Sequence, residues 1–160
     1  MTSFKRPEAV IVDVDGTLVD VSSVRHYVIA ALLPDGSYKT KDFDAFHRES
    51  VNCPPIWETV GRVNRWFNDG TKILIVTARS ERYYGPTAWW LAENNIPHHE
   101  LYMRADRDFR PDYVIKSEIL ARITKRYNVI HAIDDNPAVI RLWEENGIET
   151  TVVPGWEEAA

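Results

Sequence analysis

Three short, mostly apolar runs, each followed at once by polar residues, constrain the fold of this chain most strongly. The runs are residues 9–12, 72–76 and 129–133. Runs that are apolar on both alternating faces are typical of parallel strands buried on both sides of a sheet. Helical patterns separate the runs, and every parallel crossover needs a connecting element of that kind. The sequence therefore predicts an α/β protein in three layers, with helices on both faces of a parallel sheet.

Apolar residues at helical spacing indicate the helices between these strands. Ile56, Val60, Val63 and Phe67 share one side of a predicted helix, and Gly70 suits the position after its last turn. Further helices are predicted over residues 87–95, 112–127 and 137–146, with a last strand over 148–153. Four tryptophans on these helices are expected to pack in the core rather than to stack on bases, namely Trp57, Trp66, Trp89 and Trp143. This alternation is that of a Rossmann-like fold.

Residues 20–55 interrupt the alternation between the first strand and the first helix. A connection of this length is too long for a simple loop, so the sequence predicts a small cap or flap inserted after the first strand. Within it, residues 24–33 suit a short helix or a hairpin arm, and Pro34-Asp35-Gly36 is typical of a turn. At 160 residues, the chain is expected to form one domain, residues 1–160, that carries this insertion.

Charge and residue spacing exclude several classes of protein. The net charge of −5 does not favour electrostatic binding of a whole duplex, so any contact with nucleic acid is expected to be local. Cys53 is the single cysteine, which excludes an internal disulfide and a metal site built from thiolates. The glycines form neither a Walker A loop nor a G-x-G-x-x-G turn. No run is long enough for a membrane helix or a signal peptide, so we expect a cytoplasmic protein.

Polar side chains follow all three predicted strands. Asp13 and Asp15 follow the first, Thr77-Ala78-Arg79 the second, and Asp134 and Asp135 the third. Because ligands of open parallel sheets bind beyond the carboxyl ends of the strands, these residues are expected to form one site. Four carboxylates at one edge repel one another unless a cation neutralises them, which favours Mg²⁺ with oxygen ligands. The alternative for Asp135 is that it caps the helix that follows.

The predicted helix after Pro111 carries a second indication. Its apolar stripe, which includes Ile115 and Ile119, also includes Lys116. A lysine aimed at the core needs an anion, and Asp112 one turn earlier, the acids at the strand ends and a phosphate would all supply one. The alternative is a lysine whose stem packs while its ammonium group reaches water.

These residues, in this order, resemble the four motifs of the haloacid dehalogenase superfamily of phosphotransferases. The motifs are Asp13-Val14-Asp15-Gly16-Thr17, Thr77, Lys116 and Asp134-Asp135. The sequence around the last three is similar to the phosphatase half of phage-type polynucleotide kinase/phosphatases. The chain departs from that family because it lacks the kinase P-loop and has a longer insertion. An arginine that the family uses to bind substrate matches Arg25.

The resemblance implies roles for the acidic residues. Asp13 is the expected nucleophile, which attacks phosphorus and forms an aspartyl-phosphate. Asp15 is the expected general acid and base, and crowding by other acids is expected to raise its pKa so that it holds a proton. Asp13, the main-chain carbonyl of Asp15, and Asp134 or Asp135 are the expected ligands of Mg²⁺.

The resemblance also implies roles for the residues around the phosphate. Thr77, the amide of Ala78 and Lys116 are expected to hold the phosphoryl oxygens. Asp112 is expected to orient Lys116. Arg79 is expected to bind the phosphate through two parallel hydrogen bonds.

The sequence around Arg79 and Asp112-x-x-x-Lys116 resembles phosphatases that heal nucleic-acid ends. The resemblance implies a phosphate monoester as the substrate, most specifically the 3′-phosphate of a DNA or RNA end or a nucleoside 3′-phosphate. An insertion too short to seal the site would admit a polymer, and five arginines near the strand ends could meet its backbone, namely Arg79, Arg82, Arg104, Arg107 and Arg110. The alternatives are a solvated arginine face, a small-molecule phosphatase such as a nucleotidase, and a catalytically silent phosphate-binding domain. A phosphoaspartate receiver has its acidic pair and its single aspartate in the opposite order. The sequence indicates no partner protein.

Overall fold

The computed structural model describes residues 4–155 and contains one five-stranded sheet, in the order β3-β2-β1-β4-β5. Every neighbouring pair of strands is parallel. The strands are β1 (Glu8–Val12), β2 (Lys72–Ser80), β3 (Glu100–Arg104), β4 (Asn128–Asp134) and β5 (Glu149–Val152). The strands at residues 9–12, 72–76, 129–133 and 148–153 were all predicted, and all lie in this sheet.

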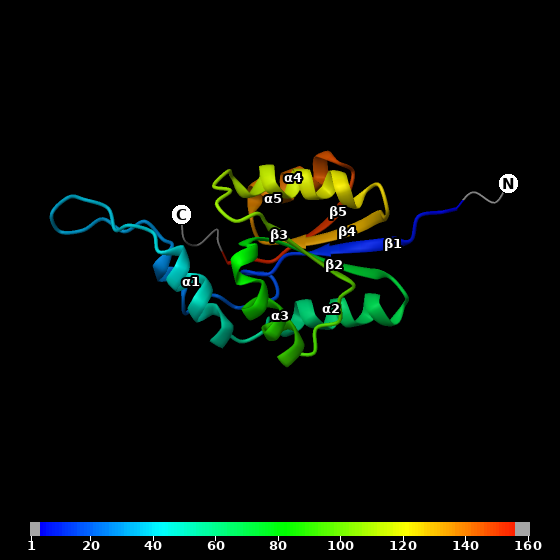
Figure 1. The fold of residues 1–160 in the computed structure, drawn as a ribbon, viewed down its shortest axis with the longest axis horizontal. Helices are drawn as coiled ribbons and strands as arrows, with labels where there is room; N and C mark the ends of the chain where they lie inside the picture. The colour runs from blue at the N-terminus through cyan, green and yellow to red at the C-terminus, as the bar shows by residue number, and fades with distance from the viewer. Residues whose placement is uncertain (1–3, 156–160) are drawn as a thin grey trace.

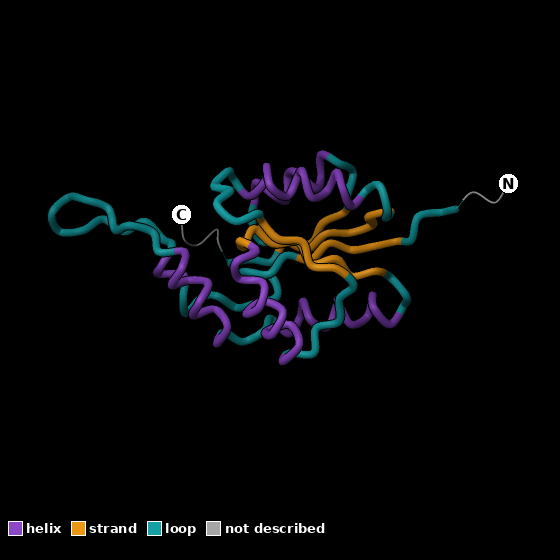
Figure 2. Tube along the Cα trace, viewed as in Figure 1, coloured by secondary structure: helices purple, strands orange, loops and turns teal. Residues whose placement is uncertain are grey.

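Four helices cover the sheet in two layers. Figure 2 shows α2 (Trp57–Asn68) and α3 (Tyr84–Glu93) on one face and α4 (Asp112–Ile123) and α5 (Pro137–Glu145) on the other. The predicted three-layer, Rossmann-like α/β fold is therefore confirmed. Within residues 4–155, no helix is both long and apolar enough to cross a membrane.

Strand β3 is one of the elements that the sequence did not predict. All five of its residues are half-buried, and it begins with Glu100 and ends with Arg104. It lies at the edge of the sheet, beside β2 only, so its sequence needs no continuous apolar run. An edge strand of mixed composition gives little signal to a search for buried strands.

The central strand β1 shows how the two layers of helices are held. Val10 and Val12 belong to a core cluster shared with α2, α3 and the insertion. Ile11, on the opposite face of the strand, belongs to a second cluster with α4 and α5. The chain crosses from β3 to β4 over β1 and β2, so the strand order reverses beside β1. In sheets of this kind the crevice at the reversal point is where ligands bind.

Residues 20–55 form the cap segment. Its two ends lie side by side, since the amide of Asp20 donates to the carbonyl of Pro54 at 2.9 Å. The cap segment contains α1 (Phe43–Glu49) and two short 3₁₀ turns, Arg25–Tyr27 and Ser50–Asn52. It also contains a hairpin arm that turns at Gly36 and projects away from the sheet (Figure 1). Both alternatives predicted for the start of the insertion, a short helix and a hairpin arm, are therefore present.

The tryptophans divide into two groups. Trp143 is fully buried and Trp66 packs against the core, as predicted. Trp57 is 67% exposed and Trp89 is 54% exposed, so the prediction of core packing is wrong for these two. Both lie on helices whose inward faces are filled by smaller residues and by Trp90.

Replacing Ile123 by alanine is expected to lower the free energy of unfolding by about 2–5 kcal/mol, because loss of this fully buried side chain leaves a cavity beneath α4. Leu32, which is 66% exposed on the hairpin arm, is the matched control, and Leu32→Ala is expected to change stability by at most about 0.5 kcal/mol. Urea denaturation of both variants measures the difference. Equal losses would contradict this assignment of the core.

Candidate active site

The carboxyl ends of β1, β2 and β4 meet at a pocket of about 800 Å³. Asp13, Asp15, the segment from Thr77 to Arg79, Asp134 and Asp135 all line it. The cap segment and the loop of residues 105–111, between β3 and α4, line its sides. The structure thus brings together the predicted strand-end residues, because parallel strands end at one edge of the sheet.

Lys116 lies at the floor of this pocket, with its side chain only 3% exposed. Its Nζ donates to Asp13 Oδ1 and to Asp134 Oδ2, both at 2.8 Å. Helix α4 therefore points a charged group inward, as the apolar stripe predicts, and the alternative in which the ammonium group reaches water is excluded. The lysine bridges two strands that are far apart in the sequence.

Further hydrogen bonds fix the two carboxylates that Lys116 contacts. The hydroxyl of Thr17 donates to Asp13 Oδ2 at 2.9 Å. The backbone amides of Asp135 and Asn136 donate to Asp134 Oδ1 at 2.9 and 3.1 Å. Because each of these carboxylates is held at both oxygens, neither is free to rotate.

Asp13, Asp134 and Asp135 form a cluster whose carboxylate oxygens lie within 4.8 Å of one another. Burial, and next the charge of a neighbouring acid, raise the pKa of Asp13 to about 7 and that of Asp135 to about 10. Asp135 Oδ2 is buried and has no hydrogen-bond partner among the described residues. With Asp15, four carboxylates face two buried cations in the described part of the chain, Lys116 and Arg79. The cluster therefore suits a divalent cation with oxygen ligands.

Arg79 binds Asp15 rather than standing free to hold a phosphate. Its Nε and Nη2 donate to the two oxygens of Asp15 at 2.9 and 2.5 Å. Its remaining contacts are the hydroxyls of Ser50 and Thr87, at 2.8 and 3.1 Å, and it is 2% exposed. The predicted two-bond contact of Arg79 with phosphate is therefore replaced by one with a carboxylate of the same shape.

This pairing also corrects the expected pKa of Asp15. Burial acts to raise it, but the charge and hydrogen bonds of Arg79 outweigh burial, and the pKa of Asp15 lies below its ordinary value. The prediction that crowding by acids keeps Asp15 protonated in the free protein was wrong. The sequence places the acids close together but does not reveal that the buried guanidinium of Arg79 pairs with both oxygens of Asp15.

Asp112 also has a different partner from the predicted one. It accepts a hydrogen bond from Arg104 Nη2 at 2.7 Å, and the carboxylates beside Lys116 belong to Asp13 and Asp134. The predicted pairing of Asp112 with Lys116 was wrong because Lys116 points into the site, toward the strands, whereas Asp112 is 47% exposed at the pocket wall. Asp112 holds Arg104 instead.

Arg25, the match to a substrate-binding arginine, is not one of the described residues that line the pocket. Its Nη1 donates to the carbonyl of Gly155 at 2.8 Å. The longer insertion therefore leaves this arginine between the cap segment and the chain that follows β5, and the structure does not bring it to the phosphate site.

The cap segment contributes two site residues that sequence reasoning missed. Ser50 accepts the hydrogen bond from Arg79 described above. His47 lies with its Nδ1 3.9 Å from Asp15 Oδ2, and its ring packs against Phe46 and Tyr83. Burial lowers the pKa of His47 to about 4, so the ring is neutral at pH 7. No periodic pattern marks this part of the insertion, so only the fold identifies them.

Comparisons with known proteins agree with this geometry. The model of the family described as the polynucleotide kinase PNKP phosphatase domain matches residues 7–155. A viral protein carrying the name of a bifunctional polynucleotide kinase/RNA ligase, from Autographa californica nuclear polyhedrosis virus, is 34% identical over 80 residues. That match covers 49% of this chain and 12% of the viral protein.

Solved structures share the fold. A chain of the Pnkp1/Rnl/Hen1 RNA repair complex superposes with a TM-score of 0.74 at 24% identity, over 96% of this chain and 44% of that one. The class C acid phosphatase of Bacillus anthracis superposes with a TM-score of 0.68 at 12% identity, over 98% of this chain and 72% of that one. The chain thus spans less than half the length of the repair-complex protein.

Mg²⁺ is expected to stabilise the folded protein by about 2–3 kcal/mol at a concentration a hundred times its dissociation constant, because binding to the native state alone shifts unfolding. Thermal unfolding with and without Mg²⁺ measures this. The effect is expected to be larger at pH 8 than at pH 6, because protons compete with the metal at Asp13, whose pKa is about 7.

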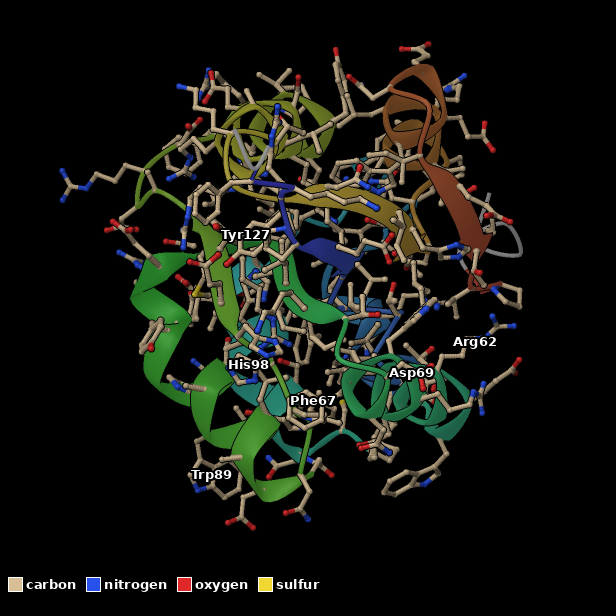
Figure 3. The ribbon with its side chains drawn as sticks, turned by 90° about the vertical axis from the view of Figure 1, so that its right-hand side faces the viewer. Arg62, Phe67, Asp69, Trp89, His98 and Tyr127 are labelled. Atoms are coloured by element: carbon tan, nitrogen blue, oxygen red, sulfur yellow. The ribbon has the colours of Figure 1, made fainter. Side chains whose placement is uncertain are left out.

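Asp135→Asn is expected to lose most of this stabilisation. Asp69→Asn is the matched control and is expected to keep it, because Asp69 is exposed at the opposite end of the sheet (Figure 3). An unchanged response to Mg²⁺ in Asp135→Asn would show that the acidic cluster is not the metal site.

Proposed function

The chain belongs to the family of polynucleotide kinase PNKP phosphatase domains, within the haloacid dehalogenase superfamily, and on this premise we propose that it is a Mg²⁺-dependent phosphomonoesterase that removes 3′-phosphate from a nucleic-acid end. One observation carries the proposal. The carboxylate of Asp13 lies at the floor of an open pocket, held by Lys116 and Thr17 and beside two further acids. That arrangement supplies a fixed nucleophile where a phosphate can reach it.

In the first chemical step, a carboxylate oxygen of Asp13 attacks phosphorus while the bond from phosphorus to the ester oxygen breaks. The products are an aspartyl-phosphate and the free alcohol, which receives its proton from Asp15. In the second step, Asp15 takes a proton from water, the water oxygen attacks phosphorus, and the bond to Asp13 breaks. Inorganic phosphate leaves and Asp13 is regenerated.

The ionised Asp15 of the free protein suits the second step, in which it acts as a base. The first step needs a proton on the same carboxyl group. A bound phosphate dianion would raise the pKa of Asp15 so that it takes up this proton, because negative charge beside a carboxylate raises its pKa. Arg79 donates to both oxygens of Asp15 and thus fixes the orientation of the carboxyl group that transfers the proton.

Lys116 and Thr77 are the side chains that stabilise charge on the phosphoryl group. The ammonium group of Lys116 is within 2.8 Å of the nucleophile, and Thr77 lines the pocket with 1% exposure. Between its paired residues Val76 and Ser80, β2 has two more residues than β3 has between Tyr102 and Arg104. A bulge of this kind interrupts the ladder, and the amide of Ala78, which lies in it, would donate to a phosphoryl oxygen.

Asp13, Asp134, Asp135 and the main-chain carbonyl of Asp15 would hold Mg²⁺. The ion would offset the excess negative charge of the site and polarise a phosphoryl oxygen. Lys116 alone does not offset that charge, as the raised pKa values of Asp13 and Asp135 indicate.

The family and the pocket together support the 3′-phosphate of a polynucleotide as the substrate. The pocket has apolar and aromatic side chains on its walls, among them Phe43, Phe46 and Phe109, which suits a nucleoside as the leaving group. We also propose that the chain acts as one phosphatase domain in which residues 20–55 serve as the cap. Residues of the cap line one side of the pocket.

Asp13→Asn is expected to abolish phosphate release, because the amide is a far weaker nucleophile, and Lys116→Ala is expected to lower kcat by a factor of about 100 to 1,000. Asp69→Asn, remote from the site, is expected to keep full activity. Release of phosphate from a chromogenic monoester in Mg²⁺ measures all three. Substantial activity of Asp13→Asn together with an inactive Asp15→Asn would exchange the two roles, and normal kinetics of Lys116→Ala would remove the lysine from the mechanism.

An oligonucleotide with a 3′-phosphate is expected to be a better substrate than the same oligonucleotide with a 5′-phosphate, because the family match extends over residues 7–155. Rates of phosphate release at matched ionic strength compare these two with mononucleotides and sugar phosphates. Preference for 5′-mononucleotides would make the chain a nucleotidase. Inactivity on every substrate with several divalent metals would indicate a silent phosphate-binding domain.

A further inference from the structure

The loop of residues 105–111 is held rigidly at the mouth of the pocket. Arg104 Nη1 donates to the carbonyls of Asp108 and Arg110 at 2.7 and 2.6 Å. Arg104 Nε donates to the carbonyl of Ala78 at 2.8 Å. One guanidinium therefore joins this loop to the phosphate-binding segment of β2, so the two keep a fixed relation.

Phe109 stands on this braced loop, lines the pocket and is 91% exposed. The cap segment also contributes an exposed aromatic side chain to the pocket, Phe43, at 56%. An exposed aromatic face beside a phosphate site suits the stacking of a nucleobase. The loop fixes the backbone of Phe109 without burying its ring, so a bound ligand is the group that would cover it.

The five arginines near the strand ends differ in whether they have partners within the protein. Four have protein partners: Arg79 holds Asp15, Arg104 braces the loop, Arg82 pairs with Asp44 and Asp106, and Arg110 pairs with Asp108 and Glu118.

Arg107 is the remaining one. It is exposed, lines the pocket, and forms no ion pair or hydrogen bond with another described residue. Its φ of 62° is one that side-chain-bearing residues rarely adopt, at a cost of about 1 kcal/mol or more. A cation held there by a braced loop is available to an anionic group of the substrate.

We propose that this loop selects a polynucleotide end over a mononucleotide: Phe109 stacks on the base of the 3′-terminal nucleotide, and Arg107 pairs with the phosphodiester on its 5′ side. The inference rests on the proposed function and deepens it. A sugar phosphate lacks both the base and the diester, and a nucleoside 3′-phosphate lacks the diester. The two side chains thus distinguish the three classes of substrate by separate contacts.

The test measures binding of a dinucleotide with a 3′-phosphate to the Asp13→Asn protein in Mg²⁺, by fluorescence anisotropy. Arg107→Ala is expected to weaken binding about fivefold and to lower the slope of log affinity against log salt by about 0.7. With a neutral methylphosphonate in place of the diester, Arg107→Ala is expected to change nothing. If Arg107→Ala lowers the affinity equally for the phosphodiester and the methylphosphonate ligand, or lowers it for neither, the role of Arg107 is overturned.

The same assay tests Phe109. Phe109→Ala is expected to weaken binding about tenfold and Phe109→Trp to retain it, because stacking needs an aromatic face. A dinucleotide without its 3′-terminal base is expected to bind both variants and the parent equally. Phe4→Ala, which removes a phenylalanine that is 98% exposed outside the pocket, is the matched control and is expected to have no effect. Equal loss with the abasic ligand, or tight binding by Phe109→Ala, would overturn the stacking role.

Phosphate release by the wild-type protein separates failure of this inference from failure of the proposed function. If no substrate releases phosphate, but Arg107→Ala and Phe109→Ala still weaken binding as expected, the phosphatase proposal alone is refuted. The opposite result is that the wild-type protein releases phosphate from the 3′-phosphorylated dinucleotide, and that Arg107→Ala and Phe109→Ala change neither this rate nor the affinity. That result would refute the role of the loop alone.

Discussion

Lys116 lies buried between the carboxylates of Asp13 and Asp134, and the geometry of the site depends on this contact. Breaking a buried ion pair on one side typically costs about 3–5 kcal/mol, because it leaves a charge without compensation. The charges are nevertheless not balanced by this pair, since Asp135 adds another acid, one of whose oxygens is buried and has no hydrogen-bond partner within residues 4–155. The fold thus assembles more acidic groups than its own cations balance, which raises the pKa values of Asp13 and Asp135 and favours a divalent cation that would replace their protons.

Three cations near this edge act on three different parts of the site. Lys116 fixes Asp13, Arg79 fixes Asp15, and Arg104 fixes the loop beside them. Arg79 also reaches Ser50 of the cap segment, so the position of the cap depends on the same guanidinium that orients Asp15. The cap and Asp15 are therefore connected through one side chain, and this connection belongs to the tertiary structure rather than to any single motif.

Local patterns in the sequence predict the strands, the position of the site and the burial of Lys116, because each depends on residues a few positions apart. The pairings across the site could not be predicted. Asp112 pairs with Arg104, Arg79 with Asp15 and Arg25 with Gly155, and each choice depends on how distant segments pack. Strand β3 and the cap residue His47 were missed for a related reason, since an edge strand and an irregular insertion have no apolar period for a search to detect.

Different parts of the pocket carry the residues for the chemical step and those that contact the rest of the substrate. The floor is formed by residues at the ends of buried strands, where packing on both faces of the sheet fixes every side chain. The walls are formed by the cap segment and the loop of residues 105–111, which carry the exposed aromatic side chains Phe43 and Phe109. Loops tolerate changes in length and sequence far better than the elements they connect. A chain of this fold can therefore keep one phosphoryl-transfer floor while its walls determine which alcohol is released.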